Sequence, residues 1–121
     1  MSKTILIVED NEMNMRFFHD LLTVNGHDTL QTKDGREAFA ITRENRPDLI
    51  LMDIQLPGLS GLDVTKMIKA DDDLKSIPII AVTALAMVGD EEKILDSGCD
   101  AYMSKPVAAE LFLETVNRFI G

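Results

Sequence analysis

The feature that most constrains this chain is a regular alternation between short apolar runs and longer segments with helical periodicity. The runs at residues 4–8, 48–52 and 77–82 are rich in Ile, Leu and Val, as expected for strands that are buried on both faces. The segments between these runs repeat apolar residues every three or four positions, which is typical of amphipathic helices. Strands that alternate with helices form parallel sheets, with helices on both faces and right-handed crossovers. The pattern therefore predicts an α/β protein with a doubly wound, five-stranded parallel sheet and five helices.

The predicted elements follow one another without a repeat or a linker. We expect strands over residues 4–8, 28–32, 48–52, 77–82 and 101–103. We expect helices over residues 11–25, 36–45, 62–70, 90–97 and 107–120. The second strand is more polar than the others, which favours a position near an edge of the sheet.

The length and charge of the chain limit its class. At 121 residues it is long enough for one domain, which we place at residues 1–121, with an ordinary core. The net charge of -9 argues against nucleic acid and anionic membranes as partners, because no basic stripe offsets the 21 acidic residues. Cys99 is the single cysteine, which favours a reducing cytoplasm. We find no signal peptide and no run long enough to span a bilayer, so we expect a soluble cytoplasmic domain.

Chemically useful side chains follow four of the five predicted strands. Glu9 and Asp10 follow the first, Asp53 the third, Thr83 the fourth and Lys105 the fifth. Taken singly, each has an ordinary explanation: Asp10 or Asn11 could cap the following helix, and Lys105 could be a solvated surface cation. The carboxyl ends of parallel strands share one edge of the sheet, so these five side chains should converge there.

Three clustered carboxylates imply a bound cation. Like charges this close together resist ionising at the same time. Mg²⁺ takes oxygen ligands, keeps several waters and typically joins one or two carboxylates to a phosphate. We therefore favour a Mg²⁺-dependent phosphate site over a purely structural role for these residues.

Four motifs, in order, resemble those of the receiver domains of two-component response regulators. They are "ILIVEDN" at residues 5–11, "DLILMDIQLPGLSG" at 48–61, "VTALA" at 82–86 and "AYMSKP" at 101–106. The resemblance covers essentially the whole chain and implies a flavodoxin-like fold of the receiver type. The stretches "NEMNMRFFHDLL" at 11–22 and "DDDLKSIP" at 71–78 further resemble the single-domain cell-division regulators of alphaproteobacteria.

The resemblance implies that Asp53 accepts a phosphoryl group from a histidine kinase or a histidine phosphotransfer protein. It implies that Asp10 and Asp53 bind Mg²⁺ directly, with the backbone carbonyl of Gln55, while Glu9 binds through a water molecule. Mn²⁺ should be tolerated in place of Mg²⁺. Lys105 should contact a phosphoryl oxygen as a point charge. Many receivers have Asp where this chain has Glu9, so the metal geometry could differ slightly.

The resemblance also implies a switch. Thr83 should move toward the phosphoryl group, and Tyr102 should then swing into the space that Thr83 leaves. Without the resemblance, Tyr102 would be read as a half-buried tyrosine with its hydroxyl in water. Pro106 directly after Lys105 suggests a cis peptide bond that aims the lysine.

Only Gly121 follows the last predicted helix, so we expect output to pass through contacts with downstream proteins and the unphosphorylated domain to be a monomer. Two surfaces are candidates. The first is an apolar stripe on the first helix, beside the face that we expect to point inward with Phe17, Leu21 and Val24. An equally favoured alternative is that this helix has no partner surface and buries one wide apolar face. The residues of this stripe are Met15, Phe18 and Leu22. The residues of the second surface are Leu85, Met87 and Val88.

Two other functions are open to a chain of this kind. An aspartyl phosphatase of the haloacid dehalogenase type also uses an Asp after a parallel strand, but it needs a second Asp two residues later, where this chain has Gln55. A flavin-binding protein would share the fold, but Glu9 and Asp10 would repel its phosphate. We therefore predict a phosphoacceptor signalling protein and not an enzyme, apart from its own phosphorylation and a slow dephosphorylation.

Overall fold

The computed structural model describes residues 3–56, 58–84 and 90–120, in which five strands alternate with five helices as predicted. The strands are β1 (Thr4–Val8), β2 (Asp28–Thr32), β3 (Leu49–Asp53), β4 (Ile79–Thr83) and β5 (Ala101–Ser104). The helices are α1 (Glu12–Val24), α2 (Gly35–Asn45), α3 (Gly61–Ala70), α4 (Asp90–Asp96) and α5 (Ala109–Ile120). The observed boundaries differ from the predicted ones by no more than two residues. Among the described residues, no helix has both the length and the apolar character needed to cross a membrane.

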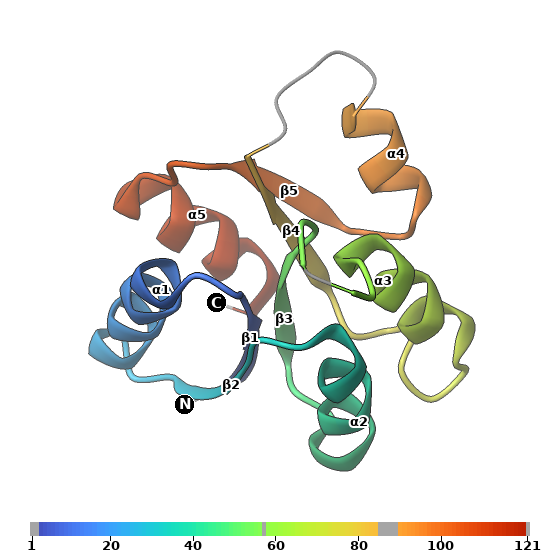
Figure 1. The fold of residues 1–121 in the computed structure, drawn as a ribbon. Coiled ribbons are helices and arrows are strands. Elements are labelled where there is room, and N and C mark those ends of the chain that lie inside the picture. Colours follow the sequence, from blue (N-terminus) through green and yellow to red (C-terminus); the bar gives the residue numbers. More distant parts are fainter. Residues whose placement is uncertain (1–2, 57, 85–89, 121) are drawn as a thin grey trace.

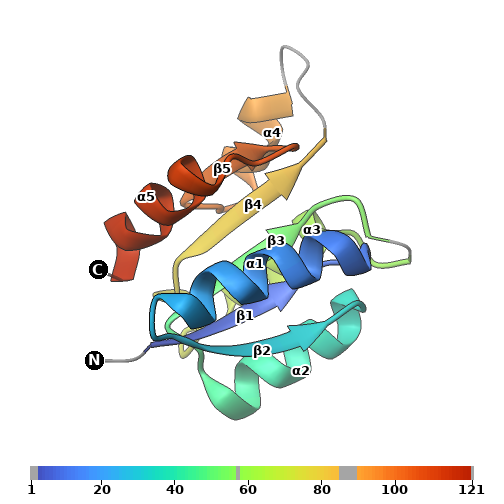
Figure 2. The same ribbon diagram turned by 90° about the vertical axis from the view of Figure 1, so that its left-hand side faces the viewer.

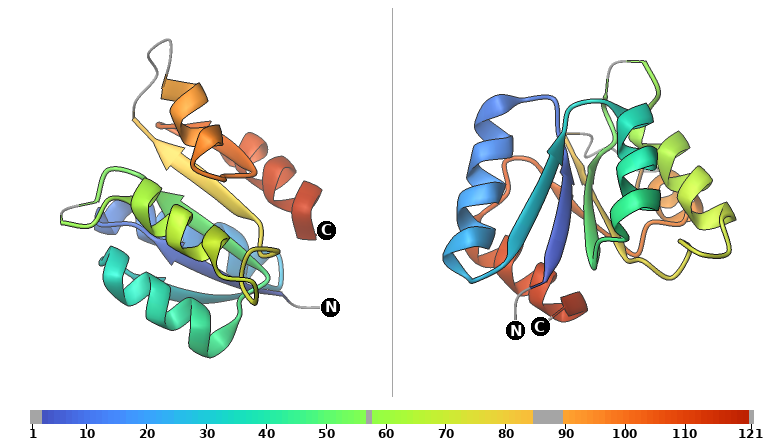
Figure 3. Two further views of the ribbon diagram at one scale, coloured as in Figure 1. Left: turned by 90° about the vertical axis from the view of Figure 1, so that its right-hand side faces the viewer. Right: turned by 90° about the horizontal axis from the view of Figure 1, so that it is seen from below.

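The strands form one parallel sheet in the order β2-β1-β3-β4-β5. Helices α1 and α5 cover one face, and α2, α3 and α4 cover the other (Figures 1 and 3). The chain runs outward from β1 to β2 and then returns to β3 on the opposite side of β1. This order confirms the doubly wound fold and places β2 at an edge, as predicted. It also creates a switch point between the carboxyl ends of β1 and β3, where ligands bind in sheets of this kind.

An apolar layer lies on each face of the sheet. In β1, Ile5 and Ile7 pack toward α1 and α5, while Leu6 and Val8 pack toward the other three helices. The alternation follows from the two-residue period of a strand. Every residue of β3 is buried, including Asp53 at its end. The third strand is therefore a rigid frame for a carboxylate.

The face of α1 that packs on the sheet is not the predicted one. Met15, Phe18 and Leu22 are 7%, 2% and 0% exposed, so they belong to the core. The ring of Phe18 stacks on Phe112 of α5, with centroids 5.0 Å apart and planes 2° from parallel. Phe17, predicted to face inward, is 38% exposed. The prediction that Met15, Phe18 and Leu22 form a partner surface is therefore wrong. The equally favoured alternative, one wide buried face, holds for these three residues and for Leu21, which packs against the same core, but not for Val24.

The physical reason for this error is that α1 carries two apolar stripes, and both have helical spacing. Periodicity alone does not say which stripe meets the sheet. The choice depends on α5, because only the stripe with Phe18 places an aromatic ring against Phe112. Val24, on the other stripe, is 85% exposed.

Candidate functional site

Four of the predicted site residues stand where four neighbouring strands end. Glu9 follows β1, Asp53 ends β3, Thr83 ends β4 and Lys105 follows β5. All strands point the same way (Figure 2), so these residues share one edge of the sheet. Asp10 is free to face this edge because Asn11 caps α1: its side-chain oxygen accepts the N–H of Asn14 at 3.0 Å.

Lys105 bridges the two buried carboxylates at this edge. Its Nζ lies 3.2 Å from Oδ2 of Asp53 and 2.8 Å from Oε1 of Glu9. The second oxygen of each carboxylate accepts a backbone hydrogen bond. Oδ1 of Asp53 accepts the N–H of Gln55 at 2.9 Å, and Oε2 of Glu9 accepts the N–H of Asn11 at 3.2 Å. Both oxygens of Asp53 are thus oriented by neighbouring groups.

Burial and mutual contact give the two buried carboxylates, Glu9 and Asp53, different pKa values. Glu9 and Asp53 are only 1% and 2% exposed. Burial, together with the hydrogen bond and charge of Asp53, raises the pKa of Glu9 to about 7. Burial opposes ionisation of Asp53 as well, but hydrogen bonds from Glu9 and the Gln55 N–H, with the charge of Lys105, outweigh it and lower the pKa of Asp53. Burial would lower the pKa of the Lys105 ammonium, but contact with Glu9 and Asp53 outweighs it and raises that pKa. Asp53 is consequently the carboxylate that stays ionised near neutral pH.

The same edge has the oxygen donors that a hard cation requires. One carboxylate oxygen from each of Glu9, Asp10 and Asp53 lies within 4.8 Å of the other two. Oε1 of Glu9 is buried, and its contact with Lys105 is an ion pair without hydrogen-bond geometry, so this oxygen retains acceptor capacity. Carboxylate oxygens are the ligands that Mg²⁺ prefers. The residues present therefore fit a divalent cation.

The two predicted switch residues lie on neighbouring strands beside this cluster. Thr83 is fully buried, and its carbonyl accepts the N–H of Lys105 at 2.7 Å. Tyr102 is half-buried in β5, against the apolar layer under α2, α3 and α4. The Lys105–Pro106 peptide bond is cis. The second predicted partner surface lies outside the described residues: Leu85, Met87 and Val88.

Gly61, predicted only to help turn the chain away after Asp53, is the first residue of α3. A Cβ atom added at Gly61 would lie 2.2 Å from the carbonyl oxygen of Asp53 and 2.7 Å from Cα of Ile54. Only a residue without a side chain lets the helix approach the end of β3 this closely. One feature of the sequence could have indicated this close approach. Glycine is a poor helix former, yet it stands at the first position of α3, directly after the cap residue Ser60.

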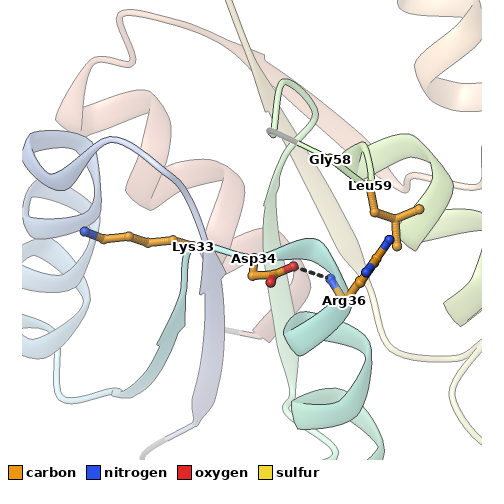
Figure 4. Close-up of a pocket in the computed structure, with 5 residues that line it drawn as sticks. All are labelled: Lys33, Asp34, Arg36, Gly58 and Leu59. Carbon is orange, nitrogen blue, oxygen red and sulfur yellow. Dashed lines mark hydrogen bonds between the residues drawn. The ribbon is translucent and has the colours of Figure 1, made fainter.

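A shallow hollow of about 360 Å³ lies beside this site, between the segments that precede α2 and α3 (Figure 4). The Asp34 carboxylate on its wall accepts the N–H of Arg36 at 2.8 Å and so caps α2. Lys33 extends away toward α1, where its Nζ lies 2.7 Å from Glu12 (Figure 4). These polar groups have local structural partners, so we assign the hollow no part in the site.

Residues 5–117 match the sequence model of the response regulator receiver domain. The chain belongs to the response regulator receiver family. This receiver domain is 56% identical to the polar-differentiation response regulator DivK of Brucella anthropi and 54% identical to that of Brucella ovis. Both alignments cover 100% of this chain and 98% of the relative. The narrower resemblance to alphaproteobacterial cell-division regulators is therefore confirmed.

Solved structures confirm the receiver fold. The receiver domain of the sensor histidine kinase PA1611 from Pseudomonas aeruginosa PAO1 is 36% identical, with a TM-score of 0.92 over 100% of this chain and 99% of that one. That structure has a magnesium ion coordinated in its active site cleft. The chemotaxis protein CheY4 of Vibrio cholerae shares the fold, with a TM-score of 0.91 at 24% identity over 98% of this chain and 99% of that one. The receiver domain is thus a signalling protein, and the haloacid dehalogenase alternative is not supported.

Proposed function

We propose that Asp53 of this receiver domain accepts a phosphoryl group from a histidine kinase or a phosphotransfer protein, in the control of cell division and polarity. The observation that carries this proposal is the setting of Asp53 at the switch point. Its carboxylate is oriented by the Gln55 N–H and by Lys105, and its pKa is lowered. An ionised, oriented carboxylate at this point of the sheet is suited to nucleophilic attack. The lone cysteine fits a reducing compartment, and we place the domain in the cytoplasm.

The reaction follows from the geometry of this cluster. An Asp53 oxygen attacks phosphorus; the O–P bond forms as the P–N bond of phosphohistidine breaks, and its electron pair returns to the imidazole. Positioning and charge neutralisation dominate such transfers. Lys105 neutralises the incoming oxygens by shifting from the carboxylates to the phosphoryl group.

Mg²⁺ supplies further charge neutralisation when bound. Asp10, Asp53 and the backbone carbonyl of Gln55 would hold it directly, with Glu9 acting through a water molecule. The magnesium ion in the active site cleft of the PA1611 receiver domain supports a cation at this cluster, as does the closeness of the three carboxylates here. We expect Mn²⁺ to substitute.

Incubation with acetyl phosphate should add a single phosphoryl group to the wild-type protein when Mg²⁺ is present. Asp53→Asn should add none, because the amide is not a competent nucleophile at this position. Intact-mass spectrometry with and without Mg²⁺ measures both results. Addition to the Asn variant at wild-type stoichiometry would show that another residue is the phosphoacceptor.

Asp10→Ala should weaken Mg²⁺ binding more than Glu9→Ala does. Asp10 is assigned a direct bond, whereas Glu9 is already paired with Lys105 and carries a raised pKa. Loss of a contact to a charged group, about 1.5–3 kcal/mol, corresponds to roughly tenfold to hundredfold in affinity. A Mg²⁺ titration of each variant gives the two constants. Equal losses would contradict this division between direct and water-mediated ligands.

Signal output would begin when Thr83 moves toward the phosphoryl group and Tyr102 then swings into the space that Thr83 leaves. Thr83→Ala should still accept phosphate, because its hydroxyl takes no part in the attack. The variant should lose the hydrogen bond from the Thr83 hydroxyl to the phosphoryl group, which is worth about 1.5–3 kcal/mol. A loss of this size shifts the equilibrium between the inactive and active conformations roughly tenfold or more. The measurement is the affinity for the cognate histidine kinase, with and without a beryllofluoride mimic of the acyl phosphate. A full phosphorylation-dependent gain in the variant would exclude Thr83 as the switch.

A further inference from the structure

Thr65, in the second turn of α3, is a fully buried hydroxyl outside the cluster described above. Its Oγ1 donates a hydrogen bond to the carbonyl of Gly61 at 2.8 Å. The same oxygen accepts the thiol of Cys99 at 3.8 Å, and that sulfur also contacts Oγ of Ser97 at 3.6 Å. The Thr65 hydroxyl is thus held on both sides, and it ties the first turn of α3 to the loop that connects α4 with β5.

Gly61, which receives this hydrogen bond, lies directly against the backbone of the phosphoacceptor. A Cβ atom at Gly61 would meet the carbonyl oxygen of Asp53 at 2.2 Å and its carbonyl carbon at 2.9 Å. The contact is between backbone and backbone, so neither side can relax by rotating a side chain. Any shift in the first turn of α3 therefore moves the peptide group of Asp53.

The opposite side of the Asp53 backbone is held by β4. Asp53 pairs with Val82 in the sheet, and the N–H of Ile54 donates to the carbonyl of Val82 at 3.3 Å. The peptide that bears the nucleophile is thus clamped between β4 and Gly61. In-line attack depends on this placement, since a misplacement of about 1 Å can cost roughly a hundredfold in rate.

We propose that Thr65 is a positioning residue for Asp53 and acts through Gly61. The inference rests on the proposed phosphoacceptor function. Thr42 of α2 provides a matched comparison: it is also fully buried, and its Oγ1 donates at 2.8 Å to the carbonyl four residues earlier, that of Ala38. The two threonines differ in the residue that they bond: the Cα of Gly61 lies against the Asp53 backbone, whereas Ala38 packs in the apolar core.

The test compares Thr65→Val with Thr42→Val, using acetyl phosphate and saturating Mg²⁺. Thr65→Val should lower the maximal rate constant of phosphorylation about threefold to tenfold, as expected for a displacement of a few tenths of an ångström. The acetyl phosphate concentration at half-maximal rate should stay unchanged. Thr42→Val should label within about twofold of the wild-type rate while losing a similar amount of stability in urea. Thr65→Ser, which keeps the hydroxyl, should phosphorylate at the wild-type maximal rate.

A wild-type rate in Thr65→Val would overturn the inference, and so would an equal slowing in Thr42→Val. If valine is not accommodated at position 65, Thr65→Ala against Thr65→Ser gives the same comparison of a missing and a retained hydroxyl. Failure of the proposed function is distinguishable, because it would appear as labelling of Asp53→Asn or as no labelling of the wild type.

Discussion

Phe18→Ala should lower the free energy of unfolding by about 3–5 kcal/mol, the usual cost of removing a large buried aromatic ring. The Phe18 side chain is 2% exposed and stacks on Phe112, which is fully buried between α5 and the sheet. The substitution leaves a cavity between α1 and α5 that these two helices cannot close without moving off the sheet. A domain with an ordinary free energy of unfolding, about 5–15 kcal/mol, would lose a large fraction of it. Urea unfolding followed by far-ultraviolet circular dichroism measures the loss.

Phe17→Ala is the matched control, because it removes the same side chain from the adjacent position on the same helix. Phe17 is 38% exposed, and its ring lies tilted against Phe18 at a centroid distance of 5.8 Å. We expect a loss of about 1 kcal/mol or less, within the range of substitutions away from the core. A larger loss for Phe17→Ala than for Phe18→Ala would mean that the other face of α1 meets the sheet.

Gly61→Ala should damage both stability and phosphorylation. The added methyl group would lie 2.2 Å from the carbonyl oxygen of Asp53, so α3 must move away from the end of β3. Overpacking of this kind costs about 1–3 kcal/mol, and displacement of Asp53, the proposed phosphoacceptor, should slow phosphorylation by roughly tenfold or more. The measurements are urea unfolding and the rate of single phosphoryl addition from acetyl phosphate.

Gly26→Ala separates the steric effect at Gly61 from the general cost of replacing a glycine. Gly26 has a φ of +85° and nothing within 4 Å of its Cβ position, so alanine there suffers backbone strain alone, about 1–2 kcal/mol. This variant should be less stable but should phosphorylate at the wild-type rate. Equal phosphorylation rates in the two glycine variants would show that Gly61 does not position Asp53.

The order of the elements and the edge that bears the site were predictable from local pattern. The apolar strands are buried on both faces, so their sequences carry little ambiguity, and residues 4–8 were placed at their observed boundaries. The more polar edge strand at residues 28–32 was also placed at its observed boundaries. A parallel sheet then brings Glu9, Asp53 and Lys105 to one edge whatever the helices do. Their convergence therefore required no knowledge of the packing.

Features that depend on contacts between distant segments were not predictable in this way. The orientation of α1 depends on the ring of Phe112, which lies 94 positions beyond Phe18 in the sequence. The role of Gly61 depends on how closely α3 approaches Asp53, a distance that no local pattern encodes. The pairing of Lys105 with both carboxylates likewise depends on the relative placement of three strand ends.

The orientation of α1 has a consequence for how proteins of this kind diversify. Its core side is occupied by Phe18 and its neighbours, while Met13, Phe17 and Val24 face outward at 83%, 38% and 85% exposure. Substitutions on the outward side change what another protein would meet without changing what the sheet packs against. The residues of this helix that hold the fold are therefore different from those that another protein could touch, so the outward residues can change without loss of the fold.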